Sequence, residues 1–146
     1  MSRSFFVETK QDKNLTIKDL IDNLKKFNLF NIADLKIVNN GNNISPDSFD
    51  NDKMFLNTGH TALMIDDTSV HITYHGSSME KDCFWWYIES RALHGIDRSF
   101  FIATVCVIAN LTDGLADSGD GAWHNTYQYH GSELWNEYLN IELNQH

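Results

Sequence analysis

The sequence predicts an α+β fold in which helices pack on an antiparallel sheet within a single compact domain. Several short segments rich in β-branched and aromatic residues are separated by turn-forming residues, as antiparallel strands are. Other segments distribute their apolar residues as helices do. The chain has 146 residues, the size of one ordinary domain, so residues 1–146 are expected to share one hydrophobic core.

The first expected elements are a strand over 4–9, rich in Phe and Val, and a helix over 17–27. Apolar residues of the helix recur at i, i+3, i+4, i+7 and i+10, which places them on one face: Ile17, Leu20, Ile21, Leu24 and Phe27. Thr16 is the expected N-cap, and Asp19 completes a capping box three residues on.

The middle of the chain is expected to be a loop followed by hairpins. Residues 39–57 are rich in Asn and Asp and include the only proline, which predicts a surface loop. Three strands then follow, with short polar segments between them that suit antiparallel hairpins: 61–65, 70–74 and 83–89.

Segment 100–111 is apolar at nearly every position, so periodicity alone does not separate a buried helix from a central strand. Its length favours a helix and its β-branched residues favour a strand. We expect a helix, capped by Asp97 and stopped by Gly114. A last helix is expected after Ser132, where four apolar residues share one side: Leu134, Trp135, Tyr138 and Leu139.

Charge is unevenly distributed along the chain, whose net charge is -9. Residues 1–27 carry six Lys and Arg against four acidic residues, whereas residues 28–146 carry five against sixteen. An acidic surface repels nucleic-acid phosphates and attracts a basic protein partner, although simple solubility explains the same surplus. Nucleic-acid binding is therefore not expected.

The expected location is the cytoplasm. The N-terminal residues contain no signal-like apolar stretch, and no segment approaches the ~20 apolar residues that cross a bilayer. Cys83 and Cys106 both lie in apolar runs, where a thiol behaves as a small hydrophobic group and no disulfide is implied.

No cofactor or metal is expected. His71 and His75 share a strand face, but four residues of strand span about 13 Å, too far to chelate one ion. Asp113, Asp117 and Asp120 lack the ligand spacing of a calcium loop and are interpreted as a turn. A small hydrolase or ligand-binding enzyme remains an alternative. It would use His124 and His130 together with the segment 113–120.

Candidate partner-binding residues lie in the acidic segments and in a pair of tryptophans. The expected binding surface is drawn from Asp113, Asp117 and Asp120, nearby residues of the 39–57 loop and the turn at Asp66 and Asp67, because loops on a rigid scaffold commonly carry recognition. The sequence does not determine whether these segments are adjacent in space. Alternation along a strand sends one ring of Trp85 and Trp86 inward and the other outward, and an outward Trp is a good interface anchor.

The last third of the chain resembles small immunity proteins of bacterial polymorphic-toxin and contact-dependent growth-inhibition systems. The resemblance lies in the order of an apolar run, an Asp-Gly segment and a closing aromatic helix: 100–111, Thr112-Asp113-Gly114, Gly121-Ala122-Trp123 and 134–138. It implies a non-enzymatic inhibitor that binds a cognate toxin domain, often a basic nuclease, in the cytoplasm. An acidic adaptor domain without a toxin partner is a further alternative.

Overall fold

The computed structural model describes residues 3–66, 68–77, 83–90, 96–118 and 128–144. It confirms the α+β fold with an antiparallel sheet, whose strands lie in the order β3-β2-β4-β5-β6-β1-β7-β8. The strands are β1 Arg3–Thr9, β2 Lys36–Asn39, β3 Asn42–Ile44, β4 His60–Ile65, β5 Thr68–Ser77, β6 Phe84–Ser90, β7 Leu115–Ser118 and β8 Gln128–Tyr129. The helices are α1 Ile17–Leu24, α2 Ile96–Thr112 and α3 Gly131–Asn144.

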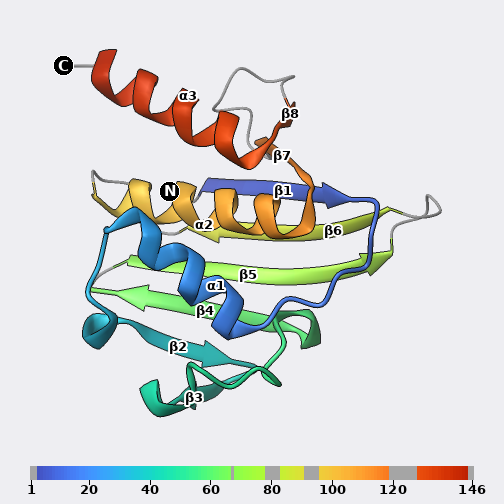
Figure 1. The fold of residues 1–146 in the computed structure, drawn as a ribbon, viewed down its shortest axis with the longest axis vertical. Helices are drawn as coiled ribbons and strands as arrows, with labels where there is room; N and C mark the ends of the chain where they lie inside the picture. Colours follow the sequence, from blue (N-terminus) through green and yellow to red (C-terminus); the bar gives the residue numbers. More distant parts are fainter. Residues whose placement is uncertain (1–2, 67, 78–82, 91–95, 119–127, 145–146) are drawn as a thin grey trace.

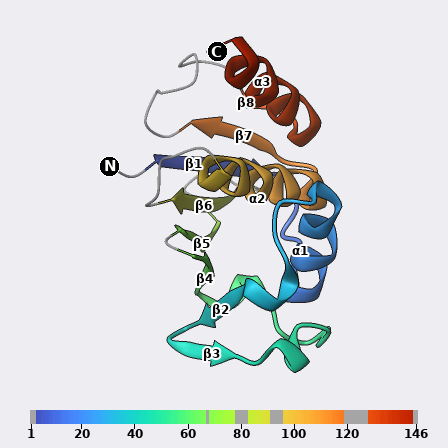
Figure 2. The same ribbon diagram turned by 90° about the vertical axis from the view of Figure 1, so that its left-hand side faces the viewer.

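The three helices cover the same face of the sheet (Figures 1 and 2). Helix α2 lies in the middle and contacts β1, β5, β6 and β7, with α1 on one flank and α3 on the other. All residues from 100 to 109 are buried, which explains why this helix is apolar on every side. No helix in the described ranges is both long and apolar enough to cross a membrane.

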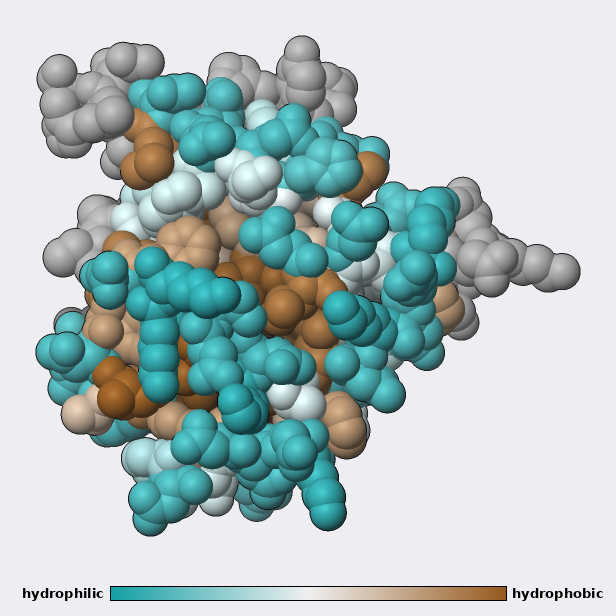
Figure 3. All heavy atoms as spheres, in the orientation of Figure 1, coloured by the Kyte–Doolittle hydropathy of each residue, from teal (hydrophilic) through white to brown (hydrophobic). Residues whose placement is uncertain are grey.

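Hydrophilic residues cover most of the helix side, and hydrophobic ones appear between them (Figure 3). This is the pattern expected when helices turn one stripe inward. Beneath them, the core is built from the inward residues of the central strands and from α1 and α2, including Val7, Leu20, Ile72, Trp86 and Phe101.

The ends of the helices follow the sequence-based expectation in part. Thr16 Oγ1 accepts a hydrogen bond from the Asp19 amide at 3.0 Å, and Asp19 Oδ2 accepts one from the Thr16 amide at 3.4 Å, so the capping box is confirmed. The α-helix ends earlier than expected, at Leu24, and a 3-10 turn continues to Phe27. Asp97 lies inside α2 and does not cap it, because the helix begins at Ile96.

The stop of α2 involves two residues. Asp113 adopts a left-handed φ of 52°, and the Gly114 amide then donates to the Ala109 carbonyl at 2.9 Å. This is the hydrogen bond of a Schellman motif. Gly114 is needed for space: a Cβ there would lie 2.8 Å from the Glu8 carbonyl oxygen in β1.

Two segments expected to be loops contain strands. Within 39–57, Asn40 and Gly41 have φ of 51° and 83°, the two left-handed residues of a type I′ turn, and they join β2 to β3. The Asp- and Gly-rich segment after α2 is strand β7 from Leu115 to Ser118, which pairs with β1. Strand pairing here overrides the local turn composition.

We expect Gly114→Ala to lower the free energy of unfolding by about 1–3 kcal/mol, because the added methyl group must displace β1 or the end of α2. Urea denaturation measures the loss, and amide NMR shifts should change at Glu8 and Thr9. The control Gly41→Ala also loses stability, because its φ of 83° strains alanine, but its added Cβ meets no atom within 4 Å, so its shift changes should stay in the β2–β3 hairpin. A Gly114→Ala variant as stable as the parent would contradict the close approach.

Candidate binding face of the sheet

The face of the sheet opposite the helices carries no described helix or strand, as the view in Figure 2 makes visible. Side chains alternate along each strand, so Phe5 and Val7 are buried under α2 while Phe6 and Glu8 lie on the other side. We call this side the outer face. Its centre is formed by half-buried residues of β1, β6 and β7: Phe6, Glu8, Trp85, Tyr87, Glu89 and Asp117.

Three aromatic rings form a cluster on the outer face. Phe6 lies opposite Tyr87 in the strand register, and their ring centroids are 5.0 Å apart. The ring of Trp85 meets Phe6 edge-on at 6.1 Å. We call Phe6, Trp85 and Tyr87 the aromatic cluster. Because β1 and β6 both lie inside the sheet with a partner on each side, the cluster is held on a rigid support.

Three carboxylates surround the aromatic cluster. Glu8 lies opposite Trp85 in the register, and its Oε1 accepts a hydrogen bond from Cys83 Sγ at 2.7 Å. Glu89 accepts one from the Tyr87 hydroxyl at 2.8 Å. Asp117 lies opposite Phe6 on the other side of β1. The outer face therefore has an aromatic centre with acidic groups on its flanks.

Asp117 is held where its negative charge is disfavoured. Partial burial raises the pKa of its carboxyl above the ordinary value, and the negative charge of Glu8 raises it further. Glu8 itself has a cation nearby, since Lys10 Nζ lies 3.8 Å from its Oε1. Two carboxylates from neighbouring strands thus share one half-buried region of the outer face.

A second polar group on this face escaped the sequence analysis. His60 Nε2 lies 2.9 Å from His71 Nδ1, and His71 Nε2 lies 3.1 Å from Ser69 Oγ. The expectation concerned His71 and His75 along one strand, whereas the contact runs across β4 and β5. The hairpin spacing was the signal that could have found it.

The order Ser69, His71, His60 resembles the hydrogen-bond chain of a hydrolytic triad, but its surroundings do not favour acyl transfer. Such chemistry needs N–H donors aimed at a developing oxyanion. Strands β4 and β5 both lie between two partner strands, so their amides are occupied by the sheet. The three side chains are partly solvated: His60 is exposed, and Ser69 and His71 are half-buried.

The other residues of the enzyme alternative show no common site in the described part of the chain. His130 is exposed at the start of α3, with Nε2 3.9 Å from Glu133 Oε1, and His124 lies outside the described residues. No cluster of three or more potential metal ligands occurs within the described ranges. Cys83 and Cys106 are buried and not joined in a disulfide, and burial raises the pKa of Cys106 to about 12.

The two tryptophans take opposite sides, as alternation predicts. Trp85 lies on the outer face, but Trp86 is 1% exposed and its ring packs 4.7 Å from that of Tyr74. Trp86 as a partner-binding residue is therefore a wrong prediction. Its position in the strand turns it toward the core.

The acidic candidates do not share one surface. Asp66 lies at the turn before β5, whereas Asp113 lies at the end of α2 beside the far ends of β5 and β6. Only Asp117 joins Trp85 on the outer face, and Asp67 and Asp120 lie outside the described residues. Asp66 and Asp113 therefore do not share one surface, because the length of the strands separates them.

We expect Asp117→Asn to raise the urea midpoint at neutral pH. A raised pKa means that folding favours the protonated form, so the ionised carboxylate lowers stability once the pH exceeds the folded-state pKa. The gain should vanish in acid, below the ordinary pKa of aspartate, where the parent side chain is neutral too. The exposed Asp52→Asn is the control. Equal midpoints of parent and Asp117→Asn at neutral pH would contradict the desolvation.

Comparisons of the chain with protein-family models, with curated proteins and with solved structures gave no match. The functional conclusion therefore depends on the outer face itself. There the structure brings together one predicted tryptophan and one predicted aspartate with Phe6, Tyr87, Glu8 and Glu89, which the sequence analysis did not single out.

Proposed function

We propose that this chain is a non-enzymatic immunity protein that binds and neutralises a basic toxin domain through the outer face. The observation that carries the proposal is the half-exposed aromatic cluster flanked by Glu8, Glu89 and Asp117 on a sheet face that no described element covers. The resemblance of the last third of the chain to immunity proteins supports the same function.

The aromatic cluster supplies the energetic centre of such an interface. Tryptophan and tyrosine are enriched among the residues that dominate binding energy, because each buries a large area and loses few rotamers. Phe6, Trp85 and Tyr87 already pack against one another. Binding therefore costs them little further ordering.

The carboxylates determine which kind of partner surface the outer face binds. Acidic groups around an apolar centre favour a surface rich in Lys and Arg, and they accelerate its approach. A nuclease needs such a basic surface to hold phosphate. An acidic inhibitor placed on it blocks nucleic acid by occupying the same cations, with no cofactor. The proposed place of action is the cytoplasm.

Co-expression tests the function directly. The product of the reading frame next to the gene of this chain should stop growth when expressed alone and should not do so when the chain is present. The purified proteins should form a complex. An adaptor would bind without protecting, and protection lost in a His130→Ala variant that still binds would favour the enzyme alternative instead.

Trp85→Ala and Phe6→Ala should each weaken the complex at least about tenfold, a loss of about 1.4 kcal/mol or more. Calorimetry measures the dissociation constant. Phe55→Ala is the matched control, because Phe55 is a 36% exposed aromatic residue outside the outer face. Unchanged thermal midpoints would show that the variants fold. If Trp85→Ala and Phe6→Ala lose no more affinity than Phe55→Ala does, the interface lies elsewhere.

The association rate should fall steeply between about 0.05 M and about 0.5 M NaCl, since the Debye length shrinks from about 14 Å to about 4 Å over this range. The dissociation rate should change much less. Stopped-flow fluorescence follows both rates. The double variant Glu8→Gln/Asp117→Asn should flatten the salt dependence. An association rate independent of salt in the parent protein would contradict electrostatic steering.

A further inference from the structure

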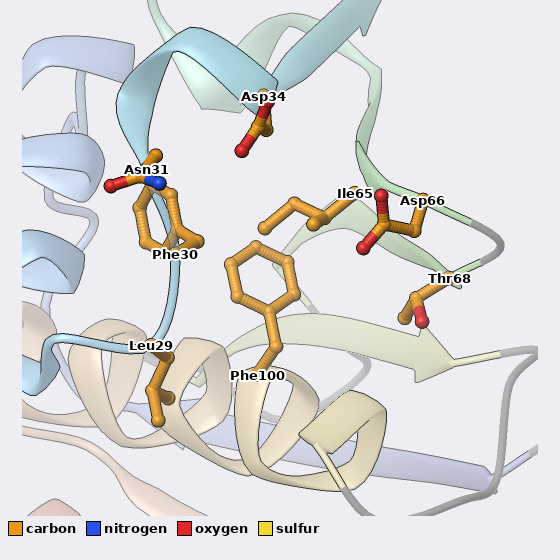
Figure 4. Close-up of a pocket in the computed structure, with 8 residues that line it drawn as sticks. All are labelled: Leu29, Phe30, Asn31, Asp34, Ile65, Asp66, Thr68 and Phe100. Carbon is orange, nitrogen blue, oxygen red and sulfur yellow. The ribbon is translucent and has the colours of Figure 1, made fainter.

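A pocket of about 250 Å³ lies on the helix side, away from the aromatic cluster. It is formed where the chain leaving α1, the β4–β5 turn and the start of α2 come together (Figure 4). Three separate stretches of sequence therefore build it. The residues that line it are Leu29, Phe30, Asn31, Asp34, Ile65, Asp66, Thr68 and Phe100.

The middle of the pocket is apolar. In Figure 4 the side chains of Phe30, Ile65 and Phe100 point toward one another. The rings of Phe30 and Phe100 meet edge-on with their centroids 5.5 Å apart, and Phe100 is 3% exposed. Such a surface suits the aliphatic or aromatic stem of a ligand.

Two carboxylates stand at the rim, on two different sides of the apolar middle (Figure 4). Asp34 comes from a 3-10 turn after α1, and Asp66 comes from the β4–β5 turn, where its φ is 52°. Both are exposed, and neither makes an ion pair or a side-chain hydrogen bond with any residue of the described ranges. A second hollow shares both acids and is also lined by Met64 and Lys36, which makes no ion pair with either acid.

The pocket also contains a buried hydroxyl that lacks a partner. Thr68 is 2% exposed, and its Oγ1 makes no hydrogen bond with the described residues. Buried polar atoms are nearly always paired in native proteins, so an unpaired one needs an explanation. Because Oγ1 itself exposes less than 1 Å² of surface, the acceptors that a ligand in the pocket meets directly are the two exposed carboxylates, Asp34 and Asp66.

We propose that this pocket binds a cationic group, an ammonium or a guanidinium, carried on an apolar stem. The stem would pack on Ile65 and the phenyl rings, whose faces also attract a cation. The charged head would lie between Asp34 and Asp66, and its N–H donors match carboxylate oxygens that have no other partner among the described residues. Two carboxylates repel an anion, and they supply too few oxygen ligands for a calcium ion.

The cationic chemistry of the pocket does not depend on the proposed function, whereas the second part of the experiment, which uses the toxin domain, rests on it. The same cationic chemistry has two sources, a free organic amine or a Lys or Arg side chain of a bound protein. The first part of the experiment therefore tests the chemistry with a small probe, and the second part identifies the source.

The probe is benzylammonium, titrated into the full chain and followed by amide NMR shifts. Phenylacetate, of opposite charge, and neutral benzyl alcohol are the matched controls. We expect saturable shifts at Phe30, Asp66 and Phe100 with benzylammonium only. Equal binding of all three probes, or shifts scattered over the acidic surface, would overturn the proposal.

Asp34→Asn and Asp66→Asn remove each charge while keeping the shape, and asparagine tolerates the left-handed backbone of Asp66. Each variant should weaken benzylammonium binding about tenfold, and the double variant should abolish it.

The control variants are aspartates in the same local backbone geometry. Asp47 lies in another 3-10 turn, and Asp113 is another exposed aspartate with a φ of 52°. Asp47→Asn and Asp113→Asn should bind the probe as the parent does, and a loss as large in these controls would overturn the proposal.

The source is then identified with the double variant and the toxin domain found by co-expression. If affinity for the toxin falls along with affinity for benzylammonium, a basic side chain of the toxin fills the pocket. If only the probe is lost, the ligand is a free amine. Both outcomes support a cationic ligand, whereas undiminished probe binding by the double variant contradicts it.

Discussion

The structure depends on the burial of α2. A helix that is apolar all round has no face to offer to water, so it needs the sheet on one side and other elements on its flanks. Helices α1 and α3 pack on its two flanks, and all three helices therefore lie on one face of the sheet. The opposite face is left to polar and aromatic residues of the strands, which is where the candidate binding site lies.

The outer face contains side chains that do not contribute to the stability of the folded chain as they would elsewhere. Asp117 is partly desolvated and lies near Glu8, so its ionised form costs stability at neutral pH. Three partly exposed aromatic rings lie beside it instead of in the core. A surface whose charges and exposed aromatic rings lower the free energy of unfolding is typical of a binding site, because a partner supplies the compensating contacts.

The sequence predicted those elements whose signal is local and strong. The capping box at Thr16 and the hairpins of β4, β5 and β6 were found because adjacent residues determine them. The β2–β3 hairpin was missed although Asn40-Gly41 is the strongest short turn signal, since the polar composition around it outweighed the dipeptide. The aromatic cluster could not be predicted, because the pairing of Phe6 with Tyr87 depends on a register between strands far apart in sequence.

The position of the outer face on the strands, with no described helix over it, also bears on the choice between recognition and catalysis. A catalytic site needs its charged groups held where water is excluded before the substrate is transformed. On a sheet face that no described helix or strand covers, water is excluded only once another surface lies over the strands. His60 and His71 illustrate the difference: their hydrogen bond lies on central strands whose amides are already paired, with His60 exposed to solvent. In the proposed complex, the same side chains and Glu8, Glu89 and Asp117 would become desolvated polar contacts, which favour a complementary partner and disfavour others.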